Sequence, residues 1–203
     1  MRYRLSTKEG PHLEALIGKS VAYARKGGVS GIPTSGAEVY IQNGGDSGRV
    51  LECVENEKAR GGLEGDIIIL NSGLHDVKTN RLTGEIQVPI GDYIRNVTAT
   101  IDVLLEGGLA ILWVNSTPVE YDRHYSLNTD FLRYNRDVVK YNDAAQEIME
   151  RYNIYTIDLY SFCGEIEGNI YCDHVHFAEE VRMLQASFIA GHIYMFSQLN
   201  IRG

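Results

Sequence analysis

Three short polar segments carry the residue types that could do chemistry. Asn43–Gly48 reads Asn-Gly-Gly-Asp-Ser-Gly, Asn71–Asp76 reads Asn-Ser-Gly-Leu-His-Asp, and Tyr171–Phe177 reads Tyr-Cys-Asp-His-Val-His-Phe. A histidine beside an acidic residue can transfer protons, and glycines let the backbone approach a ligand closely. These segments therefore indicate acid–base chemistry or the binding of a negatively charged oxygen.

The third segment has the spacing of an acid–base pair. Asp173 lies three residues before His176, so its carboxylate can hold the imidazole in one tautomer and stabilise its charged form. A polar cluster at the start of the next helix is one alternative. A metal pair of His174 and His176 is another, but it would need a third and a fourth ligand, and the sequence identifies none. We expect neither a metal nor a cofactor.

The other two segments could supply hydrogen-bond donors. His75 can donate to a developing oxyanion or act as an acid or base, although His75 and Asp76 could equally cap the next helix. The glycines near Gly45 could bring backbone N–H groups to an anion, or form an ordinary turn. Gly18-Lys19-Ser20 does not complete a P-loop, because Leu13 stands where that loop needs glycine.

Composition limits the possible partners and the compartment. The chain has 203 residues and a formal net charge of −8, with no run rich in Lys or Arg. Nucleic acids and anionic membranes bind clustered positive charge, so we expect neither as a partner. Three cysteines without a Cys-x-x-Cys pair indicate a reducing compartment. The polar amino terminus has no signal-peptide core, which predicts a cytoplasmic protein.

The hydrophobic pattern predicts one α/β domain over residues 1–203. Short apolar runs alternate with longer amphipathic stretches, as in a doubly wound, mostly parallel sheet with helices on both faces. The predicted strands are Ser20–Ala24, Val39–Ile41, Asp66–Asn71, Leu109–Asn115 and Tyr155–Leu159, and the predicted helices are Pro11–Leu16, Arg49–Asn56, Asp92–Leu105, Val138–Tyr152 and Ala178–Leu199, with a glycine-rich loop at Lys26–Gly36. Ligands of such sheets bind at the carboxyl ends of the strands, where the polar segments lie.

Taken together and in order, the three segments resemble the SGNH/GDSL hydrolase superfamily of esterases and lipases, whose sheet is flavodoxin-like. The resemblance is to a branch with Gly73-Leu74-His75-Asp76 in place of Gly-x-Asn-Asp, and it extends to Gly10–Glu14, Thr117–Val119 and Tyr141–Asn142. It implies that His176 is the general base and Asp173 its orienting partner. It also implies an oxyanion hole formed by the Gly45 N–H and His75, and a small-molecule or carbohydrate ester as substrate.

The nucleophile of that family is not visible in this sequence. Its Gly-Asp-Ser serine would fall at about Arg4, and the central strand before it is missing or degenerate, as if the chain began just after its nucleophile. Ser6, Ser20 and Ser47 could replace it, but an ordinary loop hydroxyl is the better interpretation of each of these serines. The sequence therefore leaves open an active or impaired esterase, a non-catalytic ligand-binding relative and a truncated gene product. It does not specify the oligomeric state.

Overall fold

The computed structural model of the chain describes residues 21–24, 39–42, 45–61, 67–126 and 130–200. The predicted helix Pro11–Leu16 and loop Lys26–Gly36 lie outside these residues. The elements are β1 (Val21–Ala24), β2 (Val39–Gln42), α2 (Ser47–Ala59), β3 (Ile67–Leu70), β4 (Thr79–Asn80), α3 (Ile90–Glu106), β5 (Ala110–Val114), α4 (Tyr121–Ser126), β6 (Phe131–Leu132), α5 (Asn135–Arg151), β7 (Tyr155–Ile157), α6 (Leu159–Gly164) and α7 (Glu179–Asn200).

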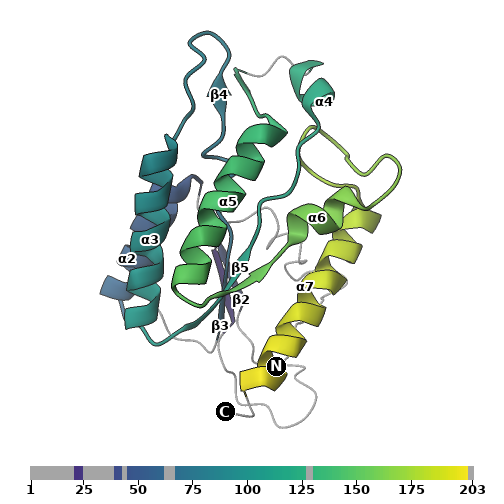
Figure 1. Cartoon of the computed structure of the whole chain (residues 1–203). Helices are drawn as coiled ribbons and strands as arrows, with labels where there is room; N and C mark the ends of the chain where they lie inside the picture. Colours follow the sequence, from purple (N-terminus) through teal and green to yellow (C-terminus); the bar gives the residue numbers. More distant parts are fainter. Residues whose placement is uncertain (1–20, 25–38, 43–44, 62–66, 127–129, 201–203) are drawn as a thin grey trace.

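The main sheet has the strand order β2-β1-β3-β5-β7. In Figure 1 the labelled strands β2, β3 and β5 lie at the centre of the molecule, with α3 on the left and α7 on the right. Its strands β3, β5 and β7 run parallel, with Ile67 opposite Ala110 and Leu112 opposite Tyr155. Both faces of a parallel sheet are covered, so its strands read as nearly continuous apolar runs. The predicted strands at these three positions are confirmed, each within two residues of the predicted bounds.

The strand between β2 and β3 departs from the flavodoxin-like pattern. The sequence predicted that a central strand of the sheet is missing or degenerate. In the structure β1 lies between β2 and β3 and runs antiparallel to both neighbours. Val21 lies opposite both Gln42 and Leu70. Antiparallel neighbours need no helical crossover, so a short segment can complete the sheet here. The sheet is thus parallel across β3, β5 and β7 and antiparallel across β2, β1 and β3.

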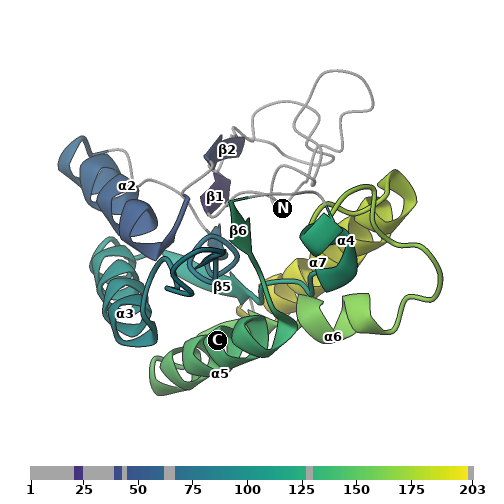
Figure 2. The ribbon, with the colours of Figure 1, turned by 90° about the horizontal axis from the view of Figure 1, so that it is seen from above.

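Helices cover both faces of the sheet (Figure 2). Side chains alternate between the faces of a strand. Ile68 and Trp113 accordingly pack with α2, α3 and α5, whereas Ile67 and Leu112 pack with α6 and α7. The fold is therefore an α/β sandwich of the predicted doubly wound class.

The longer helices follow from their sequence pattern. In α3 the buried residues Val97, Ile101 and Leu104 recur every three or four positions, which places them on one helical face. The helices α2, α3, α5 and α7 confirm the four predicted in this part of the chain, with ends shifted by one to three residues. The short elements α4, α6, β4 and β6 were not predicted, and Leu159 begins α6 instead of ending a strand.

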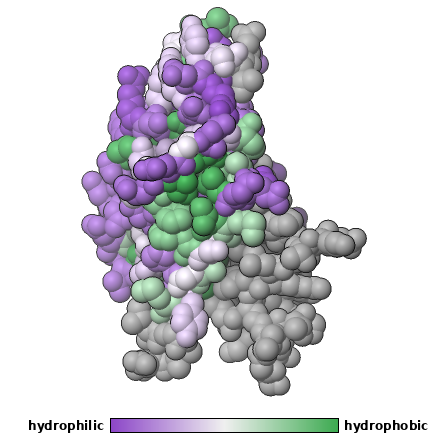
Figure 3. All heavy atoms as spheres, turned by 90° about the vertical axis from the view of Figure 1, so that its right-hand side faces the viewer, coloured by the Kyte–Doolittle hydropathy of each residue, from purple (hydrophilic) through white to green (hydrophobic). Residues whose placement is uncertain are grey.

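The helix α7 lies on the outside of the molecule. Figure 3 shows hydrophobic side chains gathered on this side of the molecule, and α7 contributes exposed hydrophobic residues of its own. Its exposed large hydrophobic residues are Met183, Leu184, Tyr194 and Met195. Within the described part of the chain, no helix combines the length and apolar character needed to cross a bilayer.

Two adjacent leucines of α3 test this packing. Leu104 is 0% exposed and Leu105 is 42% exposed. We expect Leu104→Ala to lower the free energy of unfolding by about 2 to 5 kcal/mol, because it leaves a cavity against the sheet. The matched change Leu105→Ala should cost about 1 kcal/mol or less. Urea denaturation followed by circular dichroism measures both values, and equal losses would contradict the orientation of α3.

Candidate active site

The first polar segment forms the start of α2. Gly45 has a φ of +69°, a left-handed conformation that glycine adopts without strain. The next residue, Asp46, caps the helix, because its Oδ1 accepts the N–H of Arg49 at 3.1 Å. Ser47, the first helical residue, is buried. The part of the segment before Gly45 lies outside the described residues.

The second polar segment is a turn directly after β3, and it requires glycine at Gly73. The φ of Gly73 is +145°, and a Cβ there would lie 2.6 Å from the Oγ of Ser116. The carbonyl oxygen of Ser72 accepts hydrogen bonds from the hydroxyls of Tyr93 at 3.1 Å and Ser116 at 3.2 Å. These contacts hold the turn against α3 and the end of β5.

The Asp76 carboxylate joins the first two segments. Its Oδ1 accepts the N–H of Ser47 at 2.9 Å, and its Oδ2 accepts the hydroxyl of Ser72 at 3.2 Å. Asp76 is 0% exposed. Burial raises its pKa to about 6, although the hydrogen bonds from Ser47 act in the opposite direction. The residue thus binds the start of α2 to the turn that carries His75.

His75 is a half-buried imidazole beside this carboxylate. Its pKa is lowered to about 4, mainly by burial and also by the positive charges of Lys78 and Arg133, whereas Asp46 acts in the opposite direction. His75 is therefore neutral near pH 7. A neutral imidazole still carries one N–H, so His75 can serve as a hydrogen-bond donor without a net charge.

The third polar segment contains a hydrogen-bonded Asp-His pair. Asp173 Oδ2 lies 2.6 Å from His176 Nδ1, and Asp173 Oδ1 accepts the backbone N–H groups of Val175 at 2.8 Å and His176 at 2.7 Å. Burial alone would raise the pKa of Asp173, but the hydrogen bonds from His176 and Val175 outweigh it and the pKa falls to about 2. The carboxylate is thus ionised and fixes the ring, whose side chain is 63% exposed.

A buried arginine links the His75 turn with the Asp-His pair. Arg133 is 5% exposed, and its Nε donates to the carbonyl oxygen of Leu74 at 2.5 Å. Its positive charge acts on His75 and His174, and the negative charge of Asp173 acts on it in turn. Burial lowers the pKa of Arg133 to about 10, which leaves it charged near pH 7. Arg133 thus lies within electrostatic range of both His75 and Asp173.

The described residues do not supply a nucleophile for His176. Ser47, Ser72 and Ser116 are buried and hydrogen-bonded to other groups. Among the described residues, no hydroxyl is hydrogen-bonded to the His176 ring. The expected position at Arg4 and the candidates Ser6 and Ser20 lie outside the described residues. In that described part, no three His, Cys, Asp or Glu side chains gather in an arrangement that could hold a metal ion.

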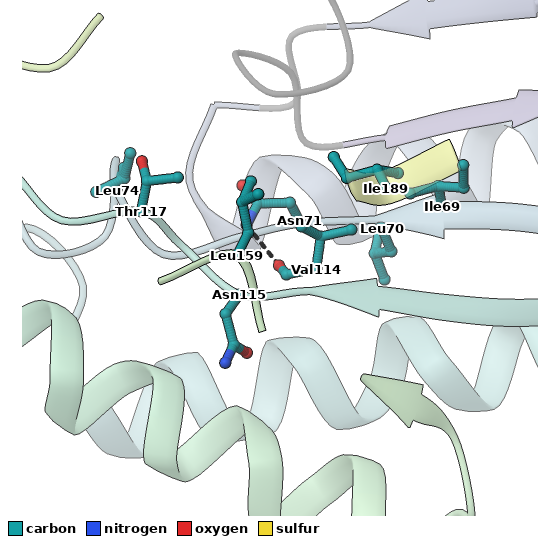
Figure 4. Close-up of a pocket in the computed structure, with 9 residues that line it drawn as sticks. All are labelled: Ile69, Leu70, Asn71, Leu74, Val114, Asn115, Thr117, Leu159 and Ile189. Carbon is teal, nitrogen blue, oxygen red and sulfur yellow. Dashed lines mark hydrogen bonds between the residues drawn. The ribbon is translucent and has the colours of Figure 1, made fainter. Parts of the chain in front are cut away.

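A narrow pocket opens at the carboxyl ends of β3 and β5 (Figure 4). Asn71 crosses this edge and donates from Nδ2 to the carbonyl oxygen of Val114 at 2.7 Å. Leu74, the neighbour of His75, is part of the wall. The lining residues are Ile69, Leu70, Asn71, Leu74, Val114, Asn115, Thr117, Leu159 and Ile189. The pocket is mainly apolar, and its volume of about 10 Å³ is about that of one water-sized sphere.

A wider groove of about 560 Å³ lies between α4 and the loop before α7. Tyr121 stacks on Tyr134 there, with ring centroids 5.2 Å apart. Arg123 fixes the opposite wall by donating to Tyr171 O at 2.7 Å and Asn169 Oδ1 at 2.9 Å. The groove thus combines aromatic and polar walls close in sequence to Asp173.

Sequence reasoning missed Arg133 and the support of the Gly73 turn. Arg133 lies in a segment without a recognisable motif, and its contact with Leu74 spans 59 positions of the chain. Asn142 accepts the N–H of Ser116 and donates to its carbonyl oxygen, both at 2.9 Å. The Tyr141-Asn142 pair was part of the family resemblance, which was the only signal for that role.

The buried carboxyl of Asp76 generates a prediction about pH. Its pKa is about 6 in the folded protein and 3.8 in its ordinary state, so between these values the folded protein holds a proton that the unfolded chain has released. Raising the pH therefore destabilises the folded protein, by up to about 3 kcal/mol. We expect Asp76→Asn, which cannot titrate, to gain stability relative to the unchanged protein between about pH 4 and 7.

Urea denaturation of both proteins across this range measures the difference. Asp158→Asn is the matched control: burial raises the pKa of Asp158, but hydrogen bonds from Ser161 outweigh it and the net shift is downward. The stability that ionised Asp158 contributes is therefore fully present above its ordinary pKa. The difference in free energy of unfolding between Asp158→Asn and the unchanged protein should then not change with pH. A difference for Asp76→Asn that does not change with pH would contradict the buried carboxyl.

Comparison with solved structures identifies the fold. The lipase/acylhydrolase from Enterococcus faecalis aligns over 74% of this chain and 71% of its own, with 18% identity and a TM-score of 0.59. A member of the lipolytic G-D-S-L family from Veillonella parvula covers 74% and 75%, with 16% identity and a TM-score of 0.54. The carbohydrate acetylesterase Est24 from Sinorhizobium meliloti covers 85% and 74%, with 12% identity and a TM-score of 0.54. Neither a family model nor a curated protein matches. The described part of the chain therefore has the fold of GDSL-type acylhydrolases.

Proposed function

We propose that this protein is an SGNH-type hydrolase of carboxylic esters in which His176 is the general base and Asp173 orients it. The observation that carries the proposal is the 2.6 Å contact between Asp173 Oδ2 and His176 Nδ1. An ionised carboxylate at this distance fixes the tautomer that leaves Nε2 as the proton acceptor. The exposure of the His176 ring leaves room for a substrate beside it.

The proposed oxyanion hole consists of the Gly45 N–H and the His75 side chain. Both belong to segments that the Asp76 carboxylate ties together through Ser47 and Ser72. A donor is most effective when it is fixed before the reaction, because no free energy is then spent on reorientation. His75 also meets the chemical requirement, since its lowered pKa keeps it neutral.

The reaction follows the usual course of acyl transfer. An attacking hydroxyl forms a bond to the ester carbonyl carbon and gives its proton to His176, and the carbonyl oxygen takes the negative charge. The tetrahedral intermediate then expels the alcohol, which receives the proton from His176. Water attacks the acyl group in the same way and releases the acid. The proposed attacking group is a serine hydroxyl outside the described residues.

We further propose an acylated carbohydrate as the substrate. The aromatic and polar groove at Tyr121 and Tyr171 suits a sugar, because aromatic faces and hydrogen-bonding groups are both present. The structural neighbour Est24 is a carbohydrate acetylesterase, which supports this choice.

The assignment of the base predicts a selective loss of activity. We expect His176→Ala to lower kcat/KM for 4-nitrophenyl acetate by at least about 100-fold, because no group then accepts the proton. Asp173→Asn should lower it as well, since the ring loses its orienting charge. Asp158→Asn is the matched control: Asp158 also accepts a backbone N–H, from Ser161 at 3.1 Å, but no histidine contact is shown for it. Equal rates for His176→Ala and the unchanged protein would refute the assigned base.

A second candidate function is ligand binding without turnover. It is favoured by Arg4 at the expected nucleophile position, since a guanidinium cannot act as a nucleophile at ordinary pH, and by the burial of Ser47.

A serine-reactive fluorophosphonate separates the two candidates. The esterase predicts a covalent adduct on one serine, located by peptide mass spectrometry, that is lost in His176→Ala. The binding protein predicts no adduct, together with saturable binding of an acetylated sugar. An adduct on any serine would exclude the non-catalytic alternative.

A further inference from the structure

Arg133 is a buried cation that the proposed mechanism does not use. It is 5% exposed, and a buried charge is costly unless it is paired or hydrogen-bonded. Within the described part of the chain, only Nε of its guanidinium makes a hydrogen bond, to the carbonyl oxygen of Leu74. No carboxylate forms an ion pair with it there. Among the described residues, the two terminal nitrogens, with four N–H groups, thus have no hydrogen-bond partner.

The guanidinium is held in place from two sides. The Leu74 carbonyl oxygen fixes Nε at 2.5 Å, and the ring of Phe131 lies under the guanidinium carbon at 4.9 Å. Lys78 Nζ lies over the same ring, also at 4.9 Å. A planar guanidinium that is already oriented loses little freedom when it binds an anion.

The surrounding charges show where an anion would bind. On one side of Arg133 are His75, which is neutral near pH 7, and Lys78. On the other is the third polar segment with His174 and Asp173. Asp173 is an incomplete counter-ion, because its oxygens already accept from His176 and Val175. Arg133 therefore lies within electrostatic range of both His75, the proposed oxyanion donor, and Asp173, the partner of the proposed base.

We propose that Arg133 binds a carboxylate of the ester substrate, so that this protein acts on esters which carry a negative charge close to the scissile bond. A carboxylate accepts two parallel N–H groups of a guanidinium, which gives both affinity and orientation. The inference deepens the proposed function and rests on it. The charge can lie in the acyl group, as in a dicarboxylic acid monoester, or in the alcohol, as in a uronic acid.

Equilibrium binding tests the proposal without turnover, so its failure is distinguishable from failure of the esterase assignment. The probes are succinate for the acyl group and D-glucuronate for the alcohol, with D-glucose as the neutral control. Chemical shifts of the histidine ring protons report binding at constant ionic strength near pH 7. We expect succinate or glucuronate to bind and Arg133→Met to weaken that binding by about tenfold or more. The probe that binds identifies the part of the substrate that carries the charge.

Lys78→Met is the matched control, because it removes a cation from the same Phe131 ring but leaves the guanidinium in place. It should weaken binding by less than about threefold. Arg133→Lys keeps the charge without the planar fork, so it should bind more weakly than the unchanged protein even if Arg133→Met does not fold. The proposal is overturned if neither anion binds the unchanged protein, or if the Arg133→Lys variant binds the anion as tightly as the unchanged protein does. It is also overturned if Lys78→Met loses as much affinity as Arg133→Met.

Discussion

The buried carboxylate of Asp76 is the interaction on which the rest of the candidate site depends. It accepts the N–H of Ser47 at the start of α2 and the hydroxyl of Ser72 just after β3, and so joins two segments that α2 and β3 separate in the chain. Removing either donor would leave part of a buried carboxyl group without a partner, which is costly. His75 adjoins Asp76, and Gly45 lies two residues before Ser47. Their relative position is therefore set by the scaffold and not by the substrate.

The same network continues across the carboxyl edge of the sheet. Ser72 accepts from Ser116 at the end of β5, and Asn142 of α5 brackets Ser116 with two hydrogen bonds. Gly73 permits this close approach, because any side chain there would meet the Ser116 hydroxyl. The turn that carries His75 is thus fixed to β5, α3 and α5 together. A loop supported in this way can present a donor with little motion, as electrostatic stabilisation of an oxyanion requires.

The sequence predicted the parts of this structure that local physics determines. The run Ile67–Leu70 specifies a buried strand, the spacing of Val97, Ile101 and Leu104 specifies a helix, and the Asp173 to His176 spacing specifies the pair that forms. It did not predict the antiparallel direction of β1, because strand direction depends on how the sheet is completed and not on the apolar pattern. It also did not single out Arg133, since the contact with Leu74 joins residues far apart in the chain and leaves no local pattern.

Two different electrical environments meet at this edge of the sheet. On one side, burial keeps His75 neutral and raises the pKa of Asp76. On the other, hydrogen bonds keep Asp173 ionised beside an exposed imidazole. Acid–base catalysis benefits from such a separation, because a donor that must stay neutral and a base that must gain a proton need opposite surroundings. Arg133 lies between the two and acts on both, as its charge disfavours protonation of His75 and is attracted to Asp173. Under the proposed function, the guanidinium would therefore help to keep the two proposed roles distinct.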